Sequence, residues 1–265
     1  MSLHFSCTMC GHCCHDLRLP LSVDEAITWL ARGGEVQLFS DAIPWPEEPP
    51  PDDALAQHKR RRSFAAHCGT LPVRVSVTLV ASFAGPCPHL RADMACGAYE
   101  LRPRVCRIYP AEVSPALVLD PASKACPPEA WSPDRPPLIA GGQLVDAQTA
   151  ELIAQSREAD ARDRLAKAFL YAQLGYDTTA LANEGFAIHS PGRDQLAAAL
   201  EAARLAAAYS DHHEPASPYP WHLITNRHAT LATLQSIDAS ARLADAAPGA
   251  DAPAYLGFFE ADVPG

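Results

Sequence analysis

The sequence predicts an α+β fold, in which a small cysteine-rich domain with a short strand pair is followed by an α-helical half. Three observations support this prediction. The 265 residues are 48% hydrophobic and 20% charged, which is enough apolar chain for one or two globular domains. All nine cysteines lie between Cys7 and Cys126. Beyond Asp146 the chain is rich in alanine, with apolar residues at helical spacing.

Charge and hydropathy exclude several classes of function. The formal net charge of −10 argues against a protein that binds nucleic acid by neutralising phosphates. No stretch of 18 apolar residues is present, so we expect no membrane-spanning helix. The N-terminus lacks a basic region followed by an apolar core, so we expect a cytoplasmic protein without a secretory signal. In a reducing cytosol, dense cysteines bind metal more often than they form disulfides.

The first two segments after the early cysteines have contrasting patterns. Residues Ser22 to Gly33 begin with an N-cap serine, have a glutamate three residues later and end in a glycine pair, which predicts a short helix. Residues Ile43 to Asp53 include five prolines and several acidic residues, which predicts an extended surface loop.

Two strands are predicted in the cysteine-rich half. Residues Leu71 to Phe83 alternate β-branched and polar side chains, as in a strand with one buried face. A second, shorter strand is predicted at Ala116–Leu119.

The proline-rich run from Pro127 to Pro137 predicts a domain boundary. We therefore expect a metal-binding domain over residues 1–137, an α-helical region over 138–248 and a weakly structured tail over 249–265. Within the helical region, one broad apolar face is expected to include Leu152, Ile153, Leu165, Phe169 and Leu170. Further helical runs at 194–209 and 226–243 suggest a small bundle.

The strongest motif is the run Cys7-Thr-Met-Cys10-Gly-His-Cys13-Cys14. Two residues between cysteines let a tight turn aim both sulfurs at one ion, and Gly11 can adopt the positive φ of such a turn. This spacing suits zinc or an iron–sulfur cluster. The adjacent Cys13 and Cys14 side chains leave the backbone in different directions, so the run serves either more than one site or a polynuclear centre.

A second group of cysteines follows at Cys87, Cys96, Cys106 and Cys126. Four early and four late thiolates make eight ligands, enough for two tetrahedral sites or two four-iron clusters. The count is compatible with two sites without requiring them.

Together these residues resemble the YkgJ-type cysteine-cluster family. The resemblance rests on the early run, Cys-Pro-x-Leu at Cys87–Leu90, Cys-x-x-Tyr-Glu-x-Arg-Pro-x-x-Cys-Arg-x-x-Pro at Cys96–Pro110 and the final Cys126, and it extends over residues 1 to about 130. The family is described as carrying a proposed zinc- or iron-chelating domain and includes flagellin lysine N-methylases. The resemblance implies an oxygen-sensitive or redox-tuned metal centre, of the iron–sulfur type, in a bacterial protein. The matched ligand positions are Cys7, Cys10, Cys13, Cys14, Cys87, Cys96, Cys106 and Cys126. Cys68 has no counterpart and is interpreted as a partly buried free thiol, with a resolving or substrate-binding cysteine as the alternative.

Other residues of the motif are expected to surround the thiolates. Arg102 and Pro103 should start a short helix that presents Cys106. We expect Arg102, Arg104 and Arg107 to offset the negative charge of a thiolate cluster, with Tyr99 and Glu100 bracing Arg104 and Arg107. His12, His15 and His89 lie beside cysteines and are expected to have supporting or surface roles, with metal ligation in place of a thiolate as the alternative.

Two features lie outside the cysteine pattern. The basic run from Lys59 to Arg62 is interpreted as a solvated surface, with an acidic partner, a phosphate or a carboxylate substrate as the alternative. The segment Asp211-His212-His213-Glu214, followed by His222 and His228, is interpreted as a loop between helices, with a second metal site as the alternative.

Three functional hypotheses remain open. The first is a metalloprotein with a redox or sensing role that holds a 4Fe-4S cluster, iron or zinc. The second is an enzyme that modifies a protein or peptide, such as a lysine N-methylase using S-adenosylmethionine, and it is implied only by the resemblance. The third is a zinc-stapled interaction or assembly module. No G-x-G-x-x-G motif, P-loop or nucleophile elbow is present.

Overall fold

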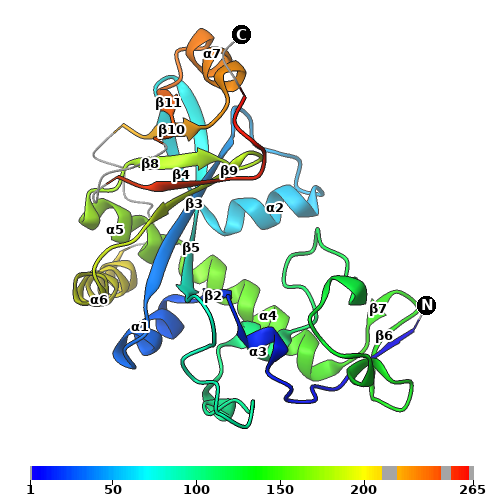
Figure 1. Cartoon of the computed structure of the whole chain (residues 1–265). Coiled ribbons are helices and arrows are strands. Elements are labelled where there is room, and N and C mark those ends of the chain that lie inside the picture. Colours follow the sequence, from blue (N-terminus) through cyan, green and yellow to red (C-terminus); the bar gives the residue numbers. More distant parts are fainter. Residues whose placement is uncertain (1, 211–219, 246–251, 263–265) are drawn as a thin grey trace. The chain divides into compact units, whose positions relative to one another are not determined.

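The computed structural model describes residues 2–210, 220–245 and 252–262, and the chain divides into two compact units (Figure 1). Unit 1 comprises Met1–Leu21 and Ala81–Ala159, and unit 2 comprises Ser22–Val80 and Asp160–Gly265. Each unit therefore consists of two separate segments of the chain. The units therefore differ from the predicted borders 1–137, 138–248 and 249–265, because residues 22–80 pack with residues from 160 onward.

Unit 1 has little regular structure beyond one long helix. Its elements are β1 (Leu3–His4), η1 (His12–Cys14), β2 (Arg18–Leu21), η2 (Tyr99–Leu101), α3 (Arg104–Ile108), η3 (Pro121–Ser123), η4 (Pro128–Trp131), β6 (Pro137–Ala140), β7 (Gln143–Leu144) and most of α4 (Ala147–Arg162). The small sheet has the antiparallel order β1-β6-β7. The core of this unit forms where Ile108 of α3 packs against Leu152 and Ile153 of α4.

Unit 2 is built on a mixed sheet. Its elements are α1 (Val23–Ala31), β3 (Val36–Pro44), α2 (Ala54–Arg61), β4 (Ser63–Cys68), most of β5 (Leu71–Ser82), α5 (Arg164–Leu174), β8 (Thr178–Leu181), β9 (Gly185–His189), α6 (Arg193–Tyr209), β10 (His222–Thr225), α7 (His228–Ser236), β11 (Ala241–Leu243) and β12 (Ala254–Gly257). The strands follow the order β11-β10-β8-β3-β5, with β4 paired to β5, and with β9 paired to both β3 and β12. Strands β3, β8, β10 and β11 run parallel, whereas β9 is antiparallel to β3.

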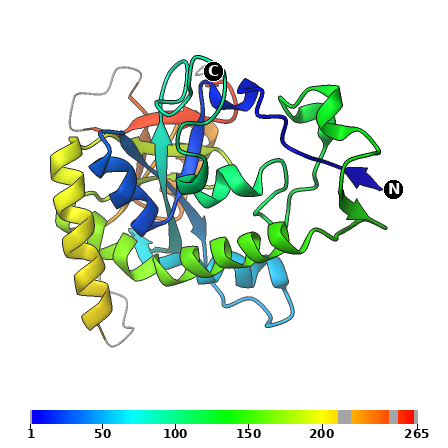
Figure 2. The ribbon, with the colours of Figure 1, turned by 90° about the horizontal axis from the view of Figure 1, so that it is seen from below.

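Helices cover this sheet and share its core. Figure 2 shows α6 as a long yellow helix beside α1, and α6 also packs against α5. Tyr171 of α5 stacks on Trp221, with ring centroids 5.7 Å apart, and both side chains are almost completely buried. No helix in the described ranges combines the length and apolar character that a membrane crossing needs.

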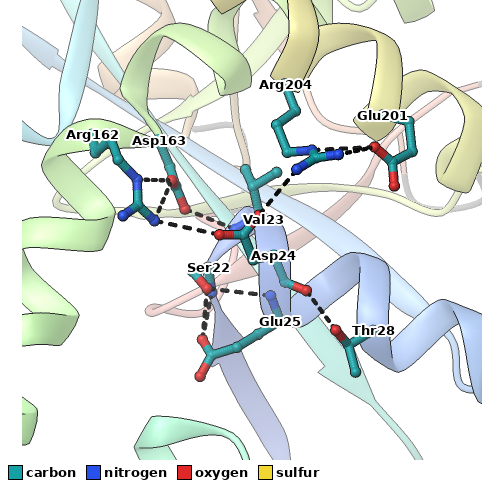
Figure 3. Close-up of polar contacts among 9 residues, drawn as sticks. All are labelled: Ser22, Val23, Asp24, Glu25, Thr28, Arg162, Asp163, Glu201 and Arg204. Atoms are coloured by element: carbon teal, nitrogen blue, oxygen red, sulfur yellow. Dashed lines mark hydrogen bonds and ion pairs between the residues drawn. The ribbon is translucent and has the colours of Figure 1, made fainter. Parts of the chain in front are cut away.

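The predicted helix after Ser22 is confirmed as α1, and Figure 3 shows how its start is fixed. Ser22 and Glu25 form the capping box that the sequence pattern predicts. The buried carboxylate of Asp163 accepts a hydrogen bond of 2.7 Å from the Val23 amide. The carboxylates of Glu25 and Asp163 thus accept hydrogen bonds from amides at the helix start that have no partner within the helix.

The α+β class is confirmed, but the second half of the chain is not a helical bundle. The predicted helices are present as α4, α5, α6 and α7, yet they alternate with five short strands, β8 to β12. The last of these, β12, pairs with β9 inside the segment predicted to be a weakly structured tail. Strands β8 and β10 are short and mostly buried, so their sequences show no clear alternation of apolar and polar residues.

Two further predictions need correction. Residues Ala116–Leu119 form no strand, and Leu117 and Val118 are 60% and 91% exposed because no neighbouring strand covers them. The single apolar face is also split. Leu152 and Ile153 belong to the core of unit 1, whereas Leu165 lies in α5 of unit 2, because the helix is interrupted at Asp163. The strand at Leu71–Ser82 is confirmed as β5, and the proline-rich loop begins only after β3 ends at Pro44.

Candidate metal centre

The structure separates eight cysteines from the ninth. Unit 1 contains Cys7, Cys10, Cys13, Cys14, Cys87, Cys96, Cys106 and Cys126. Cys68 is fully buried in β4 of unit 2, where burial raises the pKa of its thiol to about 12. A thiol in that state is protonated and unreactive at neutral pH.

The early cysteine run is a tight turn, as its spacing predicts. Gly11 has a φ of +71° and caps the single 3-10 turn η1, which carries both Cys13 and Cys14. A Cβ atom on Gly11 would meet Met94 Cε at 2.7 Å and the Met94 carbonyl oxygen at 3.0 Å. Gly11 is therefore required by its backbone conformation and by the close approach of the segment around Met94. The Met9 amide donates a hydrogen bond of 3.4 Å to Cys7 Sγ.

Backbone hydrogen bonds hold the end of this run against the second cysteine segment. The Cys87 amide donates to the Cys14 carbonyl at 2.8 Å, and the Asp16 amide donates to the Gly85 carbonyl at 2.8 Å. A bridge between Leu90 and Cys96 then folds the chain back. Cys14, Cys87 and Cys96 are thus brought together by the main chain.

The other end of the run is held against the last cysteine segment. The Ser6 amide donates to the Ala130 carbonyl at 3.0 Å, and the Ala130 amide donates in turn to the Pro127 carbonyl at 3.0 Å. The rings of Phe5 and Trp131 also contact each other, with centroids 5.0 Å apart. The segment that precedes Cys7 is therefore anchored to the turn that follows Cys126.

Cys106 lies in a short helix. The predicted helix after Arg102 and Pro103 is confirmed as α3, which has Pro103 as its N-cap. The positive charge of Arg102 lowers the pKa of the Cys106 thiol, but burial outweighs it and raises that pKa to about 12. Arg102 is held in place by its Nε, which donates to the Tyr99 carbonyl at 2.9 Å, and by the Tyr99 ring, whose centroid lies 3.6 Å from the guanidinium carbon.

The thiols share a common electrostatic environment. Burial is the largest cause of the raised pKa values of Cys13, Cys14, Cys87 and Cys126, and neighbouring thiols raise them further. For Cys13 the pKa is raised to about 12. Clustered thiols with raised pKa values hold their protons at neutral pH, and a bound cation reverses this preference by favouring thiolates.

Amide donors directed at sulfur favour the thiolate form. The His89 and Leu90 amides both hydrogen-bond to the Cys87 thiol and lower its pKa. Tyr109 donates to Cys126 and also lowers the pKa of that thiol. Hydrogen bonds of this kind stabilise metal-bound thiolates and tune the potential of iron–sulfur clusters.

The cysteines do not form a closed coordination shell in this structure. Within the described ranges, no group of three or more His, Cys, Asp or Glu side chains is arranged to hold a metal ion. A metal that binds here therefore has to draw the thiols together. Coupling of metal binding to local ordering is usual for thiolate sites. The donors fit zinc or iron by their chemistry, since thiolates are ligands of both zinc and iron–sulfur clusters.

The residues predicted to surround the thiolates lie in different environments. Arg102 lies beside Cys106, braced by Tyr99 as described above, whereas the Arg107 side chain is exposed to solvent. Arg104 lies in the first turn of α3. His15 is exposed, and its Nδ1 lies 3.2 Å from the Gly11 carbonyl oxygen. His89 interacts with the Cys87 thiol through its backbone amide.

Sequence reasoning missed the role of Tyr109. Besides donating to Cys126, its hydroxyl accepts a hydrogen bond of 3.0 Å from the Ala125 amide. Lys124 lies 5.7 Å from the centre of the Tyr109 ring and forms an ion pair with Glu112. The only signal in the sequence was a hydroxyl-bearing aromatic residue three positions after Cys106.

Two regions predicted as alternative sites give different outcomes. The basic run lies mostly at the end of α2, where Arg60 pairs with Glu48 at 2.8 Å and Arg62 pairs with Asp160 at 2.8 Å. Two of its four side chains therefore pair with acidic side chains of the chain itself. His212 and His213 lie outside the described residues.

Eight thiols in one unit, with amides and a tyrosine hydroxyl directed at them, are the donor set of a cysteine-cluster metal-binding domain. Residues 6–127 match the model of the CxxCxxCC family, whose description is "Putative zinc- or iron-chelating domain", so this segment of the chain is similar to that domain. The predicted family resemblance is thereby confirmed. Neither a curated protein nor a solved structure matches the chain.

Proposed function

We propose that unit 1 binds iron as an iron–sulfur cluster, and that the protein uses this centre in a redox or sensing role. The observation that carries the proposal is the combination of clustered thiols with hydrogen-bond donors directed at their sulfurs. Three donors are backbone amides, those of Met9, His89 and Leu90, and one is the hydroxyl of Tyr109.

The spacing within the cluster favours iron–sulfur over zinc. Cys7, Cys10 and Cys13 have the C-x2-C-x2-C spacing that supplies three ligands to a cubane cluster in bacterial ferredoxins, in which a further cysteine is followed by proline. Cys126 is likewise followed by Pro127 and interacts electrostatically with Cys7 and Cys10. When bound, such a cluster supplies one-electron redox chemistry. The surrounding amides and Tyr109 would stabilise its charge.

Metal and sulfide analysis of anaerobically purified protein tests the proposal. The expected result is iron with acid-labile sulfide, a broad visible absorption band and an electron paramagnetic resonance signal in one oxidation state. Cys126→Ser should lose the signal of the cluster that it ligates. Cys68→Ala is the matched control and should retain it, because Cys68 lies in unit 2. A colourless protein with stoichiometric zinc and no iron would overturn the iron–sulfur assignment and favour a zinc-stapled module.

The lysine N-methylase hypothesis receives no support from the described residues. It rests on the family resemblance alone.

A further inference from the structure

We infer that unit 1 holds two adjacent metal centres, each with four thiolates, and that neighbouring residues Cys13 and Cys14 serve different centres. The first set is Cys7, Cys10, Cys13 and Cys126. The second set is Cys14, Cys87, Cys96 and Cys106. This inference rests on the proposed function, because both require the thiols to bind metal.

Main-chain contacts assemble each set separately. The segment before Cys7 is bound to the turn after Cys126 through the Ser6 amide and the Ala130 carbonyl. The Cys14 carbonyl is bound to the Cys87 amide, and the bridge between Leu90 and Cys96 brings in the third cysteine of the second set. The two sets thus use different backbone connections on the two sides of η1.

The electrostatic interactions separate Cys87, Cys96 and Cys106 from the first set, whereas Cys14 interacts with thiols of both sets. Every pair within the second set interacts: Cys14 with Cys87 and Cys96, Cys87 with Cys96, and Cys106 with all three. In the first set, Cys13 interacts with Cys7 and Cys126, and Cys126 interacts with Cys7 and Cys10. Cys14 also interacts with Cys7, Cys10 and Cys13 of the first set. Each thiol of the second set therefore interacts with the other three, and Cys14 is the member that also interacts with thiols of the first set.

The backbone of η1 explains how consecutive residues can separate. A 3-10 helix has three residues per turn, so successive side chains point about 120° apart. Cys13 and Cys14 lie on this single turn, and the Cys13 thiol donates a hydrogen bond to the Cys14 thiol. The two centres are consequently neighbours, with one peptide bond joining a ligand of each.

Cobalt titration of the reduced, metal-free full chain tests the division, because tetrahedral cobalt thiolates have visible absorption bands. We expect two Co²⁺ per chain for the unaltered protein and for Cys68→Ala. The double variants Cys7→Ser/Cys126→Ser and Cys87→Ser/Cys106→Ser should each bind one. One Co²⁺ in the unaltered protein, or loss of both ions in either double variant, would overturn the division.

A matched pair of single variants guards against simple misfolding. Cys13→Ser and Cys14→Ser alter the same turn and have similar consequences for folding. We expect Cys13→Ser to leave Cys87, Cys96 and Cys106 protected from alkylation by bound cobalt while Cys7 and Cys126 react, and Cys14→Ser to reverse this pattern. Identical alkylation patterns in the two variants would refute the inference.

The outcomes also separate this inference from the proposed function. Two cobalt ions with the expected alkylation patterns, but no iron and sulfide on anaerobic reconstitution, would refute only the iron–sulfur assignment. An iron–sulfur cluster with a single cobalt site would refute only the division. No cobalt binding, together with no iron and sulfide in the anaerobic protein, would refute both.

Discussion

Replacement of Gly11 by alanine tests the close approach on which the arrangement of the cysteine run depends. Gly11 has a φ of +71°, and an added Cβ would lie 2.7 Å from Met94 Cε and 3.0 Å from the Met94 carbonyl oxygen. The left-handed backbone costs an alanine about 1–2 kcal/mol. Displacing Met94, including its backbone, adds about 1–3 kcal/mol. We therefore expect Gly11→Ala to lower the free energy of unfolding of unit 1 by about 2–5 kcal/mol.

Gly141→Ala is the matched control for the backbone contribution. Gly141 also belongs to unit 1 and has a φ of +59°, but no atom lies within 4 Å of its added Cβ. It should lose only the backbone contribution of about 1–2 kcal/mol. Urea unfolding of the metal-free proteins measures both losses, and hydrogen exchange of residues 87–97 reports whether the segment around Met94 has moved. Equal losses in the two variants would show that Met94 does not lie over Gly11 and would refute the reasoning.

Three further changes probe separate contacts. Tyr109→Phe removes the hydroxyl that donates to Cys126, so we expect about a 10-fold loss of cobalt affinity at the centre that includes Cys126; an unchanged affinity in competition with a chelator would contradict this role. Asp41→Asn tests a half-buried carboxyl whose pKa is raised from 3.8 to about 6 by burial. Because the folded state binds this proton more tightly than the unfolded state, wild-type stability should fall as pH rises from about 4 to about 6. One pKa unit corresponds to about 1.4 kcal/mol, and partial exposure reduces this effect. Urea unfolding should therefore show the stability of Asp41→Asn rising by about 1–2 kcal/mol relative to wild type across that pH window. A stability difference that does not change with pH would contradict the raised pKa of Asp41. Asp163→Ala leaves the buried Val23 amide without its carboxylate acceptor, so we expect a loss of about 1–3 kcal/mol in the free energy of unfolding of unit 2; a loss below about 0.5 kcal/mol would exclude the contact.

Local signals in the sequence were sufficient for features whose causes are local. The capping box of Ser22 and Glu25 predicts α1, and the positive φ of Gly11 follows from its place between Cys10 and Cys13. The strand β5 is long enough for its alternation to be recognised. In each case the residues that determine the conformation lie within one element.

Features whose causes are distant in sequence could not be predicted in this way. Strand β8 has only four residues, Thr178–Leu181, and is stabilised by β3 and β10 on either side. Residues Ala116–Leu119 have comparable strand propensity but no such neighbours, which shows how strongly strand formation depends on context. The division into units is equally non-local, because nothing in the sequence around Leu21 and Ser22 marks the passage from one unit to the other.

The candidate site shows the same contrast. The eight cysteines of unit 1 were recognisable from their spacing and from the family resemblance. Their grouping was not, because it depends on contacts such as that between the Cys14 carbonyl and the Cys87 amide, which join residues 73 positions apart (87 − 14). The role of Tyr109 likewise becomes visible only when the turn at Ala125 and Cys126 is placed beside it.

The double passage of the chain through each unit has a consequence for biosynthesis. Cys126 is synthesised 119 residues after Cys7 (126 − 7), and the first segment of unit 2 is made between them. At about 5–20 residues per second, the early thiols wait roughly 6–24 seconds on the ribosome before that partner exists. During this interval they are free to react with oxidants or to take up other metals. Correct loading of the protein therefore depends on the redox state and metal supply of the cell while the chain is still being made.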